Sequence, residues 1–191
     1  LLKIVLFLIV PMVYFVFYKD EVKHLKKLFV FQKKPLIKAF FLGVGVYTTI
    51  ILAYFLFSDF IDLNNIKESL SLSMGVTADN FFFVALYISF INSLLEEFFF
   101  RGYAFVILKH HIKKNYAYLF SALIFALYHV GMTQGWFAFY IYILSMIGLL
   151  VGGLIFNYLN DRWDSVYPSW LVHMFANLAI NTVGLIMFDI I

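Results

Sequence analysis

The sequence predicts an all-α membrane protein, a polytopic bundle of about six transmembrane helices that forms one integral membrane domain over residues 1–191. Hydrophobic residues make up 64% of the chain and charged residues only 13%, whereas soluble domains are about half apolar and about a quarter charged. The 25 Phe and 13 Tyr residues suit lipid-facing surfaces and membrane interfaces. This composition excludes soluble enzymes and nucleic-acid-binding domains, and the lack of Cys excludes disulfide scaffolds and thiol nucleophiles.

Six apolar segments give the expected helices in chain order. They cover residues 4–18, 36–57, 81–108, 116–133, 136–158 and 166–188. The first is short, Pro11 would kink it, and no small-residue cleavage site follows it, so it is interpreted as a membrane helix and not a signal peptide. The chain begins Leu1-Leu2-Lys3 and not with Met, which is typical of a trimmed or partial sequence. We expect a functional core over about 81–180, preceded by the helices over 4–18 and 36–57.

The connections between these segments differ in charge. The connection 19–35 is rich in Lys, and its apolar residues recur at helical spacing, so both a basic amphipathic helix on an anionic leaflet and a solvated loop are open. The connection 58–80 is acidic, and the one after residue 108 is again basic. The positive-inside rule then places the Lys-rich connections in the cytoplasm and both termini outside it.

Glycines inside two of the segments indicate close helix packing. Gly148 and Gly152 form a G-x-x-x-G pair, and Gly43 and Gly45 lie in the second segment. Small residues let membrane helices approach one another. We expect packing within one chain to be their main use, with dimerisation as the alternative.

The third segment contains charges that a lipid environment disfavours. Glu96, Glu97 and Arg101 lie close to its centre, where a charge costs about 2.5–3.5 kcal/mol on insertion scales. Glu97 and Arg101 are four residues apart and share one helix face. Glu96 is rotated by about 100° from Glu97, with no cation near it in the sequence, and Asn92 lies one turn before it as a possible hydrogen-bond donor. The alternative is a helix that ends at residue 95 with its charges at the headgroups.

Two later segments also contain polar residues. His129 follows Phe125 by four residues in the fourth segment, and His173 precedes Asn177 by four residues in the sixth. Taken singly, each has a structural explanation, either a satisfied core histidine or a hydrogen bond between helices. Because the polar clusters are confined to three of the six segments, we expect Glu96, His129, His173 and Asn177 to converge on one hydrated site.

Such a set of side chains favours hydrolysis by activated water. The chain has no H-E-x-x-H motif, no Asp pair within a span and no convincing Ser-His or Ser-Lys context. A carboxylate and an imidazole can together remove a proton from water, and a second imidazole with an amide can stabilise an oxyanion. The pattern therefore predicts direct attack of water on a peptide bond without a covalent intermediate.

The order of the motifs, E-E-x-x-x-R, then F-x-x-x-H, then H-x-x-x-N on separate apolar segments, resembles the CAAX protease and bacteriocin-processing (CPBP) family. These are the Abi-type glutamic intramembrane proteases. The resemblance covers about residues 81–180 and implies a metal-independent protease without a cofactor. It implies that Glu96 and His129 activate water, that His173 and Asn177 form the oxyanion site, and that Glu97 and Arg101 support them. Zinc bound by Glu, His and His remains an alternative.

The resemblance also implies a setting for this activity. Bacterial members are linked with bacteriocin or peptide maturation and with self-immunity, and eukaryotic members cut prenylated CAAX proteins. We expect a multi-pass protein of the bacterial cell membrane whose partners are the lipid bilayer and a peptide or protein substrate, with no role for nucleic acid. The alternative is a non-catalytic membrane protein, for immunity or as a scaffold, that binds a peptide partner. The oligomeric state is left open.

Overall fold

The computed structural model describes residues 2–133 and 135–191, and these are helical with short connections. Six helical rods correspond to the six predicted segments within that part of the chain. The all-α prediction is confirmed, and the rod boundaries differ from the predicted ones by at most five residues. The largest extension is at the end of the fifth rod, where polar residues continue the helix beyond the apolar segment.

The helices begin and end as follows. The first rod comprises α1 (Leu2–Ile4), the π-helical η1 (Val5–Ile9) and α2 (Val10–Phe17). The 3₁₀ turn η2 (Lys19–Glu21) and α3 (Val22–Leu28) lead to the second rod, α4 (Lys33–Phe57), which is followed by the turn η3 (Ser58–Phe60) and α5 (Leu63–Met74). The third rod comprises α6 (Ala78–Leu86), the π-helical η4 (Tyr87–Asn92), α7 (Ser93–Glu97), the π-helical η5 (Phe98–Phe105) and α8 (Val106–His111). The last three rods are α9 (Lys114–Thr133), α10 (Phe139–Trp163) and α11 (Val166–Met187).

Four of the six rods in the described residues have the length and polarity of membrane spans. Four helices are long and apolar enough to cross a bilayer, namely Lys33–Phe60, Ala78–His111, Phe139–Trp163 and Val166–Met187, and Val5–Phe17 is a shorter apolar helix. Large apolar side chains on their outer faces are exposed, among them Phe41, Phe55, Phe83 and Phe139. An exposed apolar surface of this extent is stable in lipid and not in water, so the chain is a multi-pass integral membrane protein.

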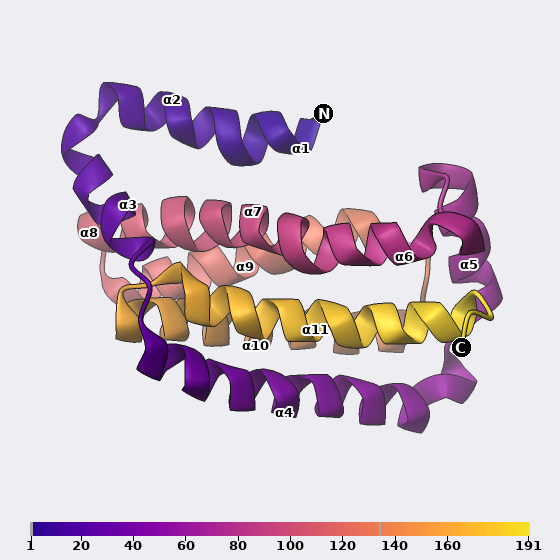
Figure 1. The fold of residues 1–191 in the computed structure, drawn as a ribbon. Helices are drawn as coiled ribbons and strands as arrows, with labels where there is room; N and C mark the ends of the chain where they lie inside the picture. Colours follow the sequence, from indigo (N-terminus) through magenta and orange to yellow (C-terminus); the bar gives the residue numbers. More distant parts are fainter. Residues whose placement is uncertain (1, 134) are drawn as a thin grey trace.

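The rods run side by side (Figure 1). α11 packs against α4 on one side and α10 on the other, and α10 also packs against α9. The third rod contacts both α9 and α11, and η1 of the first rod packs against α7 and η5. The third rod therefore contacts both helices that contain the predicted histidines. The N-terminal helix packs against the third rod as well.

The Lys-rich connection 19–35 contains a short helix that packs on the protein. α3 buries Leu28 in a cluster with Phe105, Val106 and Val166, and Leu25 packs against the same cluster. The predicted helical periodicity is confirmed, but these two apolar side chains contact the bundle and not a lipid leaflet. Its lysines Lys23, Lys26 and Lys27 are exposed.

The glycines that permit close packing are partly different from those predicted. A Cβ on Gly43 would collide with the Phe175 ring, which confirms close packing of α4 on α11. A Cβ on Gly153 would lie 3.0 Å from the backbone of Ala122 on α9, whereas Gly45, Gly148 and Gly152 have nothing within 4 Å. Packing within the chain therefore uses Gly153, and the expectation for the Gly148–Gly152 pair was wrong, because the pair faces away from α9.

Candidate active site

The third rod is widened on both sides of the glutamate doublet. The π-helical η4 and η5 flank α7, which contains Glu96 and Glu97. The rod is nevertheless continuous from Ala78 to His111, so the alternative in which the helix ends at residue 95 is wrong. Wider π-helical turns change the direction in which side chains leave the helix and occur often at functional sites.

The Glu96 carboxylate is buried and its two oxygens have different partners. Its side chain is 1% exposed. Oε1 accepts hydrogen bonds from Asn92 Nδ2 at 2.9 Å and from Lys3 Nζ at 2.6 Å. Oε2 lies 3.5 Å from His173 Nε2 and 3.8 Å from His129 Nε2. Asn92 binds Glu96 as the one-turn spacing predicted.

His129 is oriented by its own helix. Its Nδ1 lies 2.8 Å from the Phe125 carbonyl oxygen, which can only accept, so Nδ1 carries the proton and Nε2 presents its lone pair when the ring is neutral. Nε2 is the nitrogen nearest Glu96. His129 therefore has the correct tautomer to accept a proton from a group that lies between it and the carboxylate.

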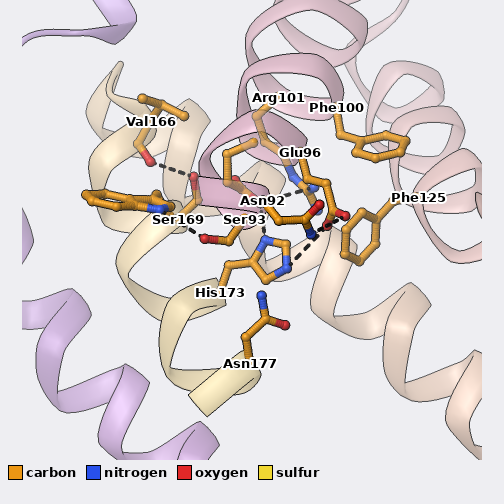
Figure 2. Close-up of polar contacts among 12 residues, drawn as sticks. Asn92, Ser93, Glu96, Phe100, Arg101, Phe125, Val166, Ser169, His173 and Asn177 are labelled. Carbon is orange, nitrogen blue, oxygen red and sulfur yellow. Dashed lines mark hydrogen bonds and ion pairs between the residues drawn. The ribbon is translucent and has the colours of Figure 1, made fainter. Parts of the chain in front are cut away.

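His173 lies between the two glutamates. Its Nδ1 is 2.9 Å from Glu97 Oε1, and its Nε2 is the atom that faces Glu96. The ring stacks on Phe156 at 5.0 Å between centroids and is 4% exposed. One carboxylate thus faces each ring nitrogen, and Nε2 is directed into the site (Figure 2).

Arg101 lies beside Glu97 and packs on the Phe125 ring. Arg101 is completely buried, and its Nη1 lies 3.2 Å from Glu97 Oε1, which confirms the predicted pair. Its guanidinium carbon lies 4.3 Å from the centroid of Phe125 and 4.8 Å from that of Phe156. Cation–π contacts of this kind stabilise a buried cation that has few hydrogen-bond partners.

Asn177 lies beside His173 but is bonded to the third rod. Its Nδ2 donates to the Ile88 carbonyl at 3.2 Å, and Figure 2 shows the amide next to the His173 ring. It belongs to a polar seam on α11, in which Trp170 donates to the Phe90 carbonyl and Asn181 to the Ala85 carbonyl. The widened turns of η4 leave carbonyls that these side chains can bind, and the seam fixes the rotation of α11.

The structure thus brings together side chains from three distant parts of the chain. Glu96, His129 and His173 meet at one point, Glu97 and Arg101 lie behind them, and Asn92 and Phe125 contact members of the set. The sequence did not indicate Lys3 as a partner of Glu96, or the bond between Glu97 and His173. A Lys directly before the apolar N-terminal segment was a signal for the first of these.

No group of three or more His, Cys, Asp or Glu side chains has the geometry of a metal site within residues 2–133 and 135–191. The two imidazoles and the carboxylate point at one another across distances of 3.5 and 3.8 Å. Both separations are longer than a usual direct N–H···O hydrogen bond.

Comparison with known proteins agrees with this arrangement. The model of the family Type II CAAX prenyl endopeptidase Rce1-like matches residues 78–179, more than half of the chain. The chain belongs to this Rce1-like family. No curated protein and no solved structure gives a significant match. The matched range includes Glu96, His129, His173 and Asn177, and the resemblance noted from the motifs is confirmed. The family supports a CAAX-type intramembrane protease as the general class.

Proposed function

We propose that this Rce1-like protein is a metal-independent intramembrane endopeptidase in which Glu96 and His129 activate water. The observation that supports it most directly is the position of Glu96 Oε2 between two imidazoles, 3.5 Å from His173 and 3.8 Å from His129. Two atoms 3.8 Å apart are too distant for a direct hydrogen bond but are well placed to share one water molecule. The three side chains come from three different helices, so only the fold brings them together.

In the proposed reaction the water oxygen attacks the carbonyl carbon of the scissile peptide. The proton that the water loses passes to Glu96 Oε2, with the neutral His129 Nε2 as the second acceptor within reach. The carbonyl oxygen becomes an oxyanion. When the C–N bond breaks, the leaving nitrogen takes a proton from protonated Glu96, which returns the carboxylate to its starting form.

The oxyanion needs donors that already lie in place. We propose that His173 donates Nε2–H to the oxyanion, with the Glu97 carboxylate holding its other ring nitrogen. The Asn177 amide has two N–H bonds, so one can hold the Ile88 carbonyl and the other can reach the oxyanion. One such donor contributes about 10²–10³ in rate in other enzymes.

The substrate that fits this setting is a membrane-associated peptide or protein, because the carboxylate is buried within an apolar bundle. We propose that the physiological process is peptide maturation or bacteriocin-related immunity in a bacterial cell membrane. We further propose that residues 1–191 act as one domain, in which the helices before residue 78 support the matched core. The polar residues needed for hydrolysis all lie between 92 and 177.

The proposal is tested with the purified protein and a membrane-anchored reporter peptide. Glu96→Gln and His129→Ala should each lower kcat by at least about 10²-fold, with the helical content and thermal midpoint of the parent. Normal turnover by folded Glu96→Gln would reject the mechanism. A chelator should leave the rate unchanged, and inhibition that zinc reverses would instead support the metal alternative.

The non-catalytic alternative is separated from hydrolysis by a protection assay. Cells that express Glu96→Ala should lose any protection against a peptide toxin that the parent chain provides, if protection depends on cleavage. Full protection by this variant would show that binding alone suffices, and the immunity or scaffold interpretation would replace the proposed one.

A further inference from the structure

The N-terminal helix places a lysine directly on the proposed catalytic carboxylate. Lys3 Nζ lies 2.6 Å from Glu96 Oε1 and also donates to Asn92 Oδ1. Lys3 and Glu96 are separated by 93 residues, so this is a contact between two helices and not a local pair. Its side chain is 24% exposed, against 1% for Glu96.

The ammonium group is held by aromatic rings as well as by the carboxylate. Nζ lies 5.1 Å from the centroid of Tyr128 and 5.4 Å from that of Phe7. Phe7 in turn stacks on Phe99 at 4.4 Å and contacts Phe100 edge to face. Stacking of Phe7 on the third rod therefore fixes the first rod at the depth at which Lys3 reaches Glu96.

The two oxygens of Glu96 consequently have separate tasks. Oε1 is held by Lys3 and Asn92, whereas Oε2 faces His129 and His173. Because Oε1 is anchored, rotation of the carboxylate is prevented and Oε2 stays directed at the imidazoles. An ammonium group at this distance is a charge-assisted hydrogen-bond donor, which holds Oε1 more firmly than a neutral donor would.

We propose that Lys3 is a positioning residue for the hydrolytic reaction, which acts by holding Glu96 Oε1 with its ammonium group and so directing Oε2 at the water. The inference rests on the proposed role of Glu96. It assigns a function to the N-terminal helix, which lies outside the matched residues 78–179. Lys3 acts through Glu96 and is not proposed to touch the substrate, so its loss should lower kcat with little change in KM.

The absence of Cys from the chain permits a direct test. In Lys3→Cys, alkylation of the new thiol with 2-bromoethylamine yields a side chain of the same length as lysine with its ammonium restored. Alkylation with iodoacetamide yields a neutral side chain at the same position. Mass spectrometry confirms each product, and Met12→Cys, on the exposed side of the same rod, controls for the reagents.

The expected result is a kcat for Lys3→Cys about ten- to hundredfold below the parent, the loss typical of a hydrogen bond to a charged group. Aminoethylation should restore kcat to within about threefold of the parent, and carbamidomethylation should not. Lys3→Arg should retain most of the activity, whereas Lys3→Met should match Lys3→Cys. Alkylation of Met12→Cys should leave kcat unchanged.

Three outcomes would overturn the inference: parental kcat in Lys3→Cys and Lys3→Met, equal recovery with both reagents, or a rise in kcat when the ammonium is removed. The last would show that Lys3 obstructs the carboxylate. Glu96→Gln is assayed in parallel. If it is inactive while Lys3→Met is fully active, only the role of Lys3 fails, and if Glu96→Gln is active, the proposed function itself fails.

Discussion

His173 Nδ1 lies 2.9 Å from Glu97 Oε1, so the second glutamate of the doublet holds the histidine that faces the first. The same oxygen of Glu97 lies 3.2 Å from Arg101 Nη1. Glu97 therefore links a buried cation to a functional imidazole, and all three side chains are 4% exposed or less. The glutamate doublet consists of one carboxylate directed at the proposed water and one that orients the supporting groups.

This linkage predicts a double effect for Glu97→Gln. The amide retains an oxygen that can accept from His173 Nδ1–H but removes the negative charge that faces Arg101. We expect kcat to fall by at least about tenfold, and the free energy of unfolding to fall by about 3–5 kcal/mol because Arg101 is left as an uncompensated buried charge. Steady-state kinetics and thermal unfolding in detergent measure the two effects.

Glu97→Asp is the matched control, because it keeps the charge on a shorter side chain. Its stability should lie between those of the parent and Glu97→Gln. A Glu97→Gln protein with parental stability and kcat would contradict the proposed linkage.

Part of this site could be predicted from the sequence because polar side chains are rare in membrane helices. Glu96, His129 and His173 stand out because polar side chains are costly in apolar helices, so their presence in three separate segments indicated a shared site. The contacts of Lys3 with Glu96 and of Glu97 with His173 could not be predicted in the same way. Lys3 reaches Glu96 only because Phe7 stacks on Phe99, and the direction of Glu97 depends on helix geometry next to η5, which sequence spacing on an ideal helix does not reproduce.

The glycine at the contact between α10 and α9 could not be predicted from the sequence motif either. Gly148 and Gly152 matched a familiar motif, but the face that α10 presents to α9 depends on the rotation of the helix. Asn157 fixes that rotation by donating to the Tyr118 carbonyl and accepting from Ser121. A single polar side chain thereby places Gly153 and not Gly152 at the contact.

The polar seam on α11 offers a pair of variants that separates catalysis from packing. Asn177 and Asn181 lie one turn apart, and each donates to a carbonyl of the third rod. Removing either amide should cost about 0.6–1.7 kcal/mol of stability, the range for hydrogen bonds between membrane helices. Only Asn177→Ala should also lower kcat, by about 10²–10³-fold, because its second N–H is proposed to hold the oxyanion.

The measurement is kcat of Asn177→Ala relative to Asn181→Ala, with thermal midpoints for both. Equal kcat values in the two variants would show that Asn177 serves packing alone, and His173 would remain as the proposed oxyanion donor.

The distribution of charge predicts how the bundle is oriented. The Lys-rich α3 and the connection after α8 lie at one end of the bundle, whereas α5, within the acidic connection 58–80, lies at the other (Figure 1). By the positive-inside rule the α3 end faces the cytoplasm. Because the chain has no Cys, single variants report directly on topology: Glu68→Cys should react with an impermeant thiol reagent applied to intact cells, and Lys23→Cys should react only after the cells are opened.

Both side chains sit outside the apolar spans, so failure to react would not reflect burial in lipid. Labelling of Lys23→Cys in intact cells, with protection of Glu68→Cys, would reverse the orientation.

The contact between α9 and α10 predicts which glycine of the fifth rod is sensitive to substitution. A Cβ on Gly153 would lie 3.0 Å from the Ala122 Cα and 3.1 Å from its Cβ, so a branched side chain there must push the two helices apart. Overpacking of this kind costs about 1–3 kcal/mol. Gly153→Val should therefore lower the thermal midpoint and also reduce kcat, since α9 contains His129 and α10 contains Phe156, which packs on His173. Gly152→Val is the matched control, because Gly152 faces open space one residue away. Its thermal midpoint and kcat should equal those of the parent. A larger effect at Gly152 than at Gly153 would show that α10 is rotated differently from the structure described.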